Sequence, residues 1–239
     1  MIGYSISIFS IALAAFLSYI LSKLTAWGAV IGAIVAMLIF VGAGYAGLMQ
    51  LAAFFILSTL ATSHKKQEKK KLSLPGEQST RDAWQVVANG GIAAICGTLA
   101  WLSPPNALYF HLMLAASLAS ATADTLSSEL GSVYGRRFYN IVTLKPDVRG
   151  EDGVVSLEGS ITGVSGAAII ALIAQINTTA LGYNKAVVII LAAGTLGNII
   201  DSVLGATLER RGYIGNNTVN AMNTFAAAII AWLLQSLFI

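Results

Sequence analysis

Long apolar stretches, separated by short polar segments, make up most of this 239-residue chain. A helix needs about 20 mostly apolar residues to cross a bilayer. Eight such stretches are found, near residues 2–22, 24–43, 45–62, 84–102, 107–126, 160–176, 186–207 and 219–238. The pattern predicts an all-α polytopic membrane protein with about eight transmembrane helices.

Composition supports this prediction. The chain is 56% hydrophobic and 10% charged, whereas soluble domains carry about 25% charged residues. We expect a single membrane domain over 1–239, with no room for a second soluble one. Its expected parts are N-terminal helices 1–63, a basic cytoplasmic loop 64–80, and a core 81–239 that carries the site and a cytoplasmic loop 131–159.

Basic residues predict the orientation in the membrane. If the Lys-rich segment 65–71 is cytoplasmic, eight alternating spans place every Lys and Arg except Lys185 on that side, as the positive-inside rule requires. Both termini are then extracytoplasmic and the polar site faces the cytoplasm. The expected setting is the lipid bilayer of the cell membrane. The net charge of +3 reflects this topology and indicates no nucleic-acid partner, and a homo-oligomer is left open.

Two further patterns concern the loops and an internal repeat. The alternating run 139–144 and the segment 154–157 predict a small β-hairpin within loop 131–159. Asp124-Thr125 and Asp201-Ser202 each close an apolar stretch that a cytoplasmic loop follows. This recurrence suggests two parallel halves that face each other.

Acidic residues at membrane depth are the strongest indication of chemistry. Asp124, Glu129 and Asp201 lie in or at the inner ends of apolar stretches, where a charge costs about 2.5–3.5 kcal/mol and marks a wet cavity or a partner. Carboxylates of this kind hold Mg²⁺ together with substrate phosphates. The alternative is that each pairs with a nearby Arg. The five-residue spacing requires the helix to end or bend near 127–128 if Asp124 and Glu129 are to converge.

Amide and hydroxyl side chains gather at the same predicted face. Four of them, Asn216, Asn217, Asn220 and Asn223, begin the last span, and Asn198 and Asn89 lie in two others. Asn can bind a metal or a phosphate oxygen, although hydrogen bonding between helices is the alternative. Ser156 can cap the next helix or bind phosphate.

Cations complete the predicted site. Among the basic residues at this face we favour Arg81 and Lys145 as phosphate-binding, with Arg149 beside them. A purely topological role is favoured for Arg136, Arg137 and the run 65–71. Acids, amides and bases at one face predict a site for a metal and a polyanion, with an apolar co-substrate entering from the bilayer. Phosphoryl transfer to a lipid phosphate requires such a site.

The residues just described also carry a family resemblance. The matching segments, in chain order, are 81–90, 123–125 with Ser128 and Glu129, 152–159, 197–206, and Asn217 with 219–220. They span nearly the whole chain, whereas the first three spans match only in character. The chain resembles the integral membrane family that includes plant phytyl-phosphate kinase and animal transmembrane protein 19.

The resemblance implies a kinase that converts a prenyl monophosphate, such as phytyl phosphate, to the diphosphate with a nucleoside triphosphate (CTP, UTP or ATP). It places Arg81, Gln85, Asn89, Asp124, Glu129, Ser156, Asp201, Asn217 and Asn220 in the site. Ser128, Asn198 and Ser202 belong to the same motifs and are expected to bind substrate or nucleotide.

Taken together, Asp124 and Asp201 are expected to anchor Mg²⁺ with help from Glu129, while Arg81 and Lys145 neutralise phosphates. The rival hypotheses are a transporter or flippase for polyprenyl phosphate or a small anion, a structural membrane protein, and a prenol kinase or cytidylyltransferase. A through-path would distinguish a transporter, and the outer halves of the last four spans look almost wholly apolar.

Overall fold

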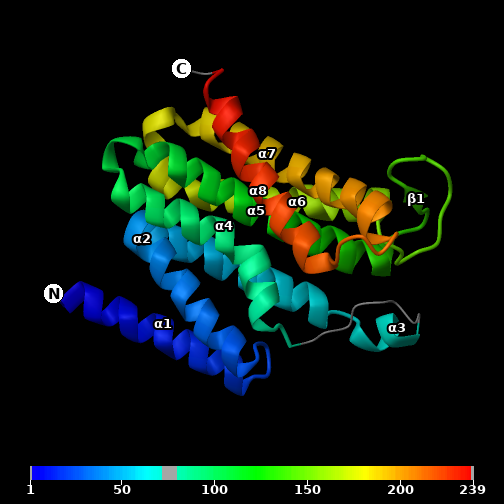
Figure 1. Ribbon diagram of the computed structural model, residues 1–239, viewed down its shortest axis with the longest axis horizontal. Helices are drawn as coiled ribbons and strands as arrows, with labels where there is room; N and C mark the ends of the chain where they lie inside the picture. The colour runs from blue at the N-terminus through cyan, green and yellow to red at the C-terminus, as the bar shows by residue number, and fades with distance from the viewer. Residues whose placement is uncertain (1, 72–79, 238–239) are drawn as a thin grey trace.

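The chain forms a bundle of long helices (Figure 1), seen in a computed structural model that describes residues 2–71 and 80–237. The helices are α1 (Ile2–Ile20), α2 (Ala26–Ser63), α3 (Lys66–Lys71), α4 (Ala83–Leu102), α5 (Ala107–Tyr134), α6 (Leu157–Thr178), α7 (Tyr183–Leu204) and α8 (Asn216–Gln235). Within the described residues, α2, α4, α6, α7 and α8 are long and apolar enough to cross a membrane. The predicted all-α membrane fold is confirmed, whereas the number of crossings stays a prediction.

Helix α2 contains two of the predicted stretches and is broken between them. Gly44 has φ +61° and ψ −151°, a conformation that glycine adopts without a steric penalty. Lys23 Nζ, before the helix, donates to Ser63 Oγ at its end over 3.4 Å, although an unbroken helix of 38 residues would be about 57 Å long. The helix therefore folds back as two arms, 26–43 and 45–63 (Figure 1).

A polar contact with α5 stabilises this break. The Gly42 carbonyl, next to the break, contacts His111 Nε2 at 2.9 Å. The other ring nitrogen of His111 lies 3.3 Å from the Asn177 carbonyl of α6. The imidazole thus links the bend of α2 to two neighbouring helices.

Helix α5 lies at the centre of the bundle, in contact with α2, α4, α6, α7 and α8. Leu112, Leu114 and Leu118 are fully buried there. Small residues allow close approach: a Cβ added to Gly131 of α5 would lie 2.8 Å from the Cα of Gly159 in α6. Because protein rather than lipid surrounds it, α5 can carry polar side chains that lipid-facing helices rarely do.

Helix α5 also corrects one sequence expectation. The stretch predicted to end near residue 126 continues as regular helix to Tyr134, so the end or bend near 127–128 that would let Asp124 and Glu129 converge is absent. At about 100° per residue, Asp124 and Glu129 then point about 140° apart around one straight helix. They face different parts of the space beside α5.

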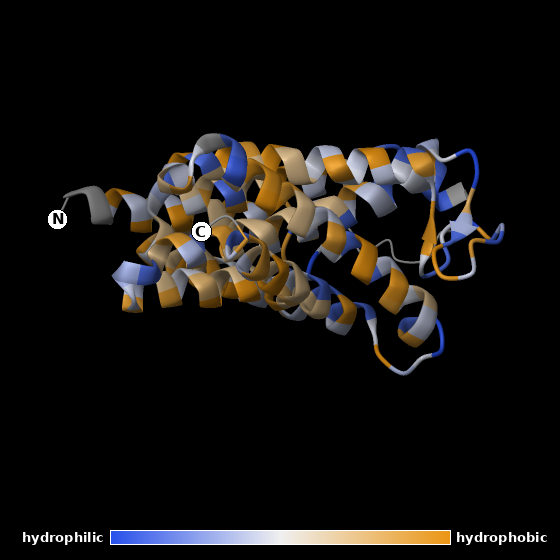
Figure 2. Ribbon diagram, turned by 90° about the horizontal axis from the view of Figure 1, so that it is seen from above, coloured by the Kyte–Doolittle hydropathy of each residue, from blue (hydrophilic) through white to orange (hydrophobic). Residues whose placement is uncertain are grey.

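The polar connections gather at one end of the bundle. There β1 (Tyr139–Asn140) pairs antiparallel with β2 (Val154–Val155), which confirms the predicted hairpin, and α7 ends in a π-helical turn, Gly205–Glu209. Figure 1 places α3 and β1 at this end and the start of α1 and the end of α8 at the other, and Figure 2 shows hydrophilic residues in the loops around the hairpin. Which side of the membrane this end faces stays a prediction. Residues 72–79 of the predicted basic loop, and residue 238 of the last stretch, lie outside the described residues.

Candidate functional site

A cavity of about 520 Å³ lies at the polar end of the bundle. Its walls come from the end of α2, from α3, from the starts of α4, α6 and α8, from the ends of α5 and α7, and from the loop that carries β2. Polar side chains from each of these elements reach it. The cavity therefore joins segments that are distant in the sequence.

Three helices begin at this cavity. Asp82 caps α4 by accepting a hydrogen bond from the Gln85 backbone over 2.9 Å, and the Gln85 side chain accepts from the Asp82 backbone. Ser156 caps α6 through a 3.1 Å hydrogen bond from Gly159 N. Asn216 starts α8 and lines the cavity. The positive ends of three helix dipoles therefore face the same space, which favours an anion.

Two aspartates meet at one end of the cavity. The carboxyl groups of Asp124 on α5 and Asp201 on α7 lie in hydrogen-bonding contact, and Asn223 of α8 donates to Asp201. The Asn223 oxygen in turn accepts from Ser120 over 3.2 Å. Two carboxylates repel unless a proton or a cation lies between them, so this contact requires positive charge.

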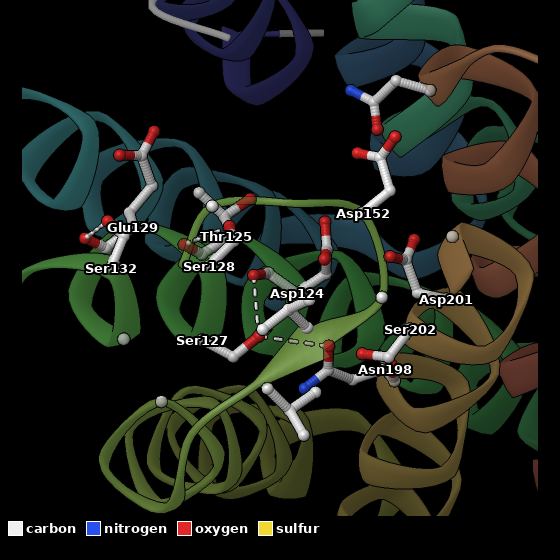
Figure 3. Close-up of a pocket in the computed structure, with 18 of the residues that line it drawn as sticks. Asp124, Thr125, Ser127, Ser128, Glu129, Ser132, Asp152, Asn198, Asp201 and Ser202 are labelled. Carbon is white, nitrogen blue, oxygen red and sulfur yellow. Dashed lines mark hydrogen bonds between the residues drawn. The ribbon is translucent and has the colours of Figure 1, made fainter. Parts of the chain in front are cut away.

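Further acids extend this acidic end. Asp152 of the loop lines the cavity near Asp124 and Asp201 (Figure 3), and Glu209 of the π-helical turn also lines it. Burial raises the pKa of Asp152, and Glu151 raises it further while Arg210 opposes the shift. Acidic groups from three elements thus converge at this end.

Hydroxyl and amide groups tie α5 to α7 beside the aspartates. Ser127 Oγ donates to Asn198 Oδ1 over 3.2 Å, a contact drawn in Figure 3. Ser202 Oγ donates to the Asn198 carbonyl, and Ser128 Oγ donates to the Thr125 carbonyl. Asn220 is 7% exposed, and its side-chain oxygen has no hydrogen-bond partner within the described residues. This oxygen is therefore available to a metal ion or a hydrogen-bond donor.

Cations occupy the other end of the cavity. Lys69 Nζ lies 2.6 Å from Glu129 Oε2, and Figure 3 shows Glu129 apart from Asp124 and Asp201. The Arg81 guanidinium lies 5.7 Å from the centre of the Phe54 ring. Burial lowers the pKa of Arg81, and the nearby Glu129 carboxylate counteracts this. The cavity thus has an acidic and a basic end.

Most residues predicted from the sequence reach the cavity. Those that line it are Arg81, Gln85, Asn89, Asp124, Ser128, Glu129, Ser156, Asn198, Asp201, Ser202 and Asn220. Three others do not: Lys145 is exposed in the loop, the Arg149 guanidinium lies over the Phe138 ring at 5.5 Å, and Asn217 follows Asn216 without lining the cavity. Their roles stay predictions.

Sequence reasoning missed Lys69, Asp152 and Glu209 as site residues, although each lines the cavity. Lys69 belongs to a run of similar lysines, and nothing in the sequence singles it out. Asp152 begins the matching segment 152–159, of which the resemblance places only Ser156 in the site. Glu209 follows Asp201 by about two helical turns, and this spacing was the available signal.

The described residues contain no group of three or more His, Cys, Asp or Glu side chains arranged to hold a metal ion. Any metal bound at the acidic end would therefore rest on the adjacent pair Asp124 and Asp201, with its remaining ligands coming from amides, water or substrate.

An all-α bundle with a polar cavity at one end defines this chain as an integral membrane protein with a candidate ligand site. The family model described as "Integral membrane protein DUF92" matches residues 9–228. The chain belongs to this family, and the family resemblance inferred from the sequence is confirmed.

Three relatives place the chain within the family. "Uncharacterized membrane protein MJ0933" of Methanocaldococcus jannaschii is 34% identical over 80% of this chain and 77% of its own length. "Uncharacterized membrane protein sll0875" of Synechocystis is 30% identical over 87% and 81%, respectively. "Protein VTE6, chloroplastic" of Arabidopsis thaliana is 28% identical over 80% of this chain and 59% of its own length. No solved structure gives a significant match.

Proposed function

We propose that the chain is a Mg²⁺-dependent phosphotransferase that converts a prenyl monophosphate to its diphosphate with a nucleoside triphosphate. The observation that carries the proposal is one cavity, at the polar end of a membrane bundle, that combines adjacent aspartates with partly buried cations. The family resemblance to plant phytyl-phosphate kinase supports the choice of a prenyl substrate, and the match to Protein VTE6 agrees with it.

The reaction needs few protein groups. An oxygen of the acceptor monophosphate attacks the γ-phosphorus and forms a new P–O bond. The bond from the γ-phosphorus to the oxygen that bridges to the β-phosphate breaks, and the nucleoside diphosphate leaves with that electron pair. Because the acceptor oxygen is already anionic, no strong base is required. Arg81 offsets phosphate charge, and the Asn220 side-chain NH2 group and the backbone N–H groups at the starts of α4, α6 and α8 donate to phosphate oxygens.

Asp124 and Asp201 fit the role of Mg²⁺ ligands. Their contact calls for positive charge, and Mg²⁺ is often held by one or two carboxylates together with substrate phosphates and water. When bound, Mg²⁺ would neutralise charge on the nucleotide phosphates. Glu129, expected from the sequence to assist, pairs with Lys69 and lies apart from the two aspartates, so we leave it out of the metal proposal.

A product analysis tests the function. Purified protein in detergent is supplied with Mg²⁺, with CTP, UTP or ATP, and with phytyl, geranylgeranyl or farnesyl monophosphate or the free prenols, and products are identified by mass spectrometry. We expect a prenyl diphosphate. A monophosphate formed from a prenol would instead indicate a prenol kinase, and a CMP conjugate would indicate a cytidylyltransferase. If no product is formed with any combination of nucleotide and prenyl compound, the proposal is contradicted.

A transporter is the second candidate, and one observation favours it. Gln175 of α6 and Gln235 of α8 are buried and carry side-chain atoms without a hydrogen-bond partner in the described residues. At 1.5 Å per residue, each lies roughly 20 Å or more along its helix from the cavity. The far ends of these helices are thus less apolar than the sequence suggested. Movement of prenyl phosphate across proteoliposomes without nucleotide would favour this candidate over the kinase.

A further inference from the structure

Lys69 differs from its neighbours in the Lys-rich segment. Its side chain is 3% exposed, whereas Lys70 is exposed. Its ammonium group lies 2.8 Å from the Ala61 carbonyl, 3.4 Å from the Thr62 carbonyl and 2.6 Å from Glu129. The first two partners are carbonyls at the C-terminal end of α2, where a cation is favoured by the helix dipole.

These contacts direct the ammonium group into the basic end of the cavity. Glu129 is a neighbour of both Lys69 and Arg81, so two cations share one carboxylate. Lys66 lines the same wall. The basic end therefore carries excess positive charge, and its natural ligand is an anion that can accept several charge-assisted hydrogen bonds.

We propose that Lys69 binds the phosphate group of the prenyl monophosphate, and that Glu129 is the counter-ion of Lys69 in the empty site and is replaced by that phosphate when it binds. The substrate class rests on the function proposed above. In this arrangement the acceptor phosphate occupies the basic end and the nucleotide phosphates the acidic end. Glu129 acts through Lys69 and does not contact substrate.

Direct binding measurements test this role. Isothermal titration of geranylgeranyl monophosphate and of geranylgeraniol into the purified full chain, without nucleotide, separates phosphate recognition from prenyl recognition. Because hydrogen bonds to charged groups contribute about 1.5–3 kcal/mol, Lys69→Gln should weaken monophosphate binding about 10- to 100-fold. Prenol binding should be unchanged. The control Lys70→Gln alters an exposed lysine one residue away and should bind like wild type.

The Glu129→Gln variant distinguishes a phosphate-binding role from a structural one. Without the carboxylate, Lys69 and Arg81 lose their shared counter-charge, and monophosphate binding should be retained or become tighter. A merely structural ion pair predicts equal losses in Glu129→Gln and Lys69→Gln. If Lys69→Gln does not fold, Lys69→Arg serves instead. This variant keeps the positive charge and should still bind monophosphate; a loss of monophosphate binding in Lys69→Arg would count against the proposal.

The inference and the proposed function fail in different ways. Wild-type monophosphate affinity in Lys69→Gln, or equal weakening of monophosphate and prenol, overturns the role of Lys69 even if diphosphate is formed. Tight, Lys69-dependent binding of monophosphate without diphosphate formation would instead contradict the kinase and leave the phosphate site intact.

Discussion

Asp124 and Asp201 come from helices far apart in the sequence, yet their carboxyl groups lie in hydrogen-bonding contact inside the cavity. Asn223, which is fully buried, holds Asp201 in this position from a third helix. Such a pair is unfavourable without a compensating positive charge. Its presence in a membrane protein therefore points to a bound cation or a shared proton as part of the site.

Removing either charge should abolish turnover while sparing the fold. In Asp124→Asn and Asp201→Asn we expect diphosphate formation to fall by about 100-fold or more, as when a preorganised electrostatic contact is lost. The unfolding temperature with EDTA should stay equal or rise, because one of two like charges is gone. Glu68→Gln, at an exposed acid of α3, is the control. Unchanged turnover in both variants would contradict the metal assignment.

Gly153 should be required for the loop between α5 and α6 to pack against the π-helical turn at the end of α7. A Cβ at this position would lie 2.3 Å from the Ala206 backbone nitrogen, and Gly153 has φ +73°. Gly212 also has φ +73° but has open space around it, so Gly212→Ala measures the backbone strain alone, about 1–2 kcal/mol. Gly153→Ala should be destabilising beyond that and should lower turnover. Equal effects of the two substitutions on thermal unfolding would show that close packing there is unimportant.

The ion pair between Asp147 and Arg210 should restrain the loop between α5 and α6 at neutral pH and lose this effect at strongly acidic pH. The two guanidinium nitrogens of Arg210 lie 2.5 and 3.2 Å from the Asp147 oxygens, and this pairing holds the pKa of Asp147 well below its usual range. A lowered folded-state pKa contributes stability above the unfolded value of about 3.9, and this is lost as the pH falls through the folded value.

Hydrogen exchange of residues 139–155, corrected for intrinsic rates, measures this effect. At pH 7, Asp147→Asn should exchange faster than wild type, and the difference should shrink as Asp147 becomes protonated in the wild-type protein. Identical exchange at pH 7 would mean that the ion pair does not restrain the loop.

His111 should stabilise the break in α2. In His111→Leu the Gly42 carbonyl loses its 2.9 Å contact, and an unpaired buried acceptor costs about 1–3 kcal/mol. The unfolding temperature in detergent should fall, with little effect on monophosphate binding. His64→Leu, which removes a contact with Tyr134 at an exposed position, should have a smaller effect, and the reverse order would contradict this role.

The fold could be predicted where apolar length alone decides the structure. The eight apolar stretches correspond to α1, the two arms of α2, and α4 to α8, because lipid-buried backbone must form helices. The end of α5 could not be predicted in this way. Its last turns carry Glu129 and Ser132, which look like loop residues by hydropathy, but their helix is packed against protein and lines a polar cavity.

The site could be predicted only in part. Asp124 and Asp201 were expected because a charge inside an apolar stretch is energetically costly, and Arg81 was expected from its position just before a predicted span. All three line the cavity. Lys69 and Lys145 show the limit, because the sequence places both at the polar end without indicating which one the fold buries. That choice depends on the path of α3 and of the loop after α5, which tertiary contacts such as the Lys69–Glu129 ion pair determine.

The most direct test of the central claim follows the γ-phosphate itself. Purified wild-type protein, Asp201→Asn and Arg81→Gln are given Mg²⁺, γ-labelled nucleoside triphosphate and geranylgeranyl monophosphate, and the label in the prenyl diphosphate is counted. We predict that the wild type transfers the label and that both variants do not. Asp201→Asn removes a negative charge from the acidic end of the cavity, and Arg81→Gln removes a positive charge from its basic end. Labelled diphosphate at wild-type levels in both variants, or none in the wild type with any nucleotide, would contradict a phosphotransferase at this cavity.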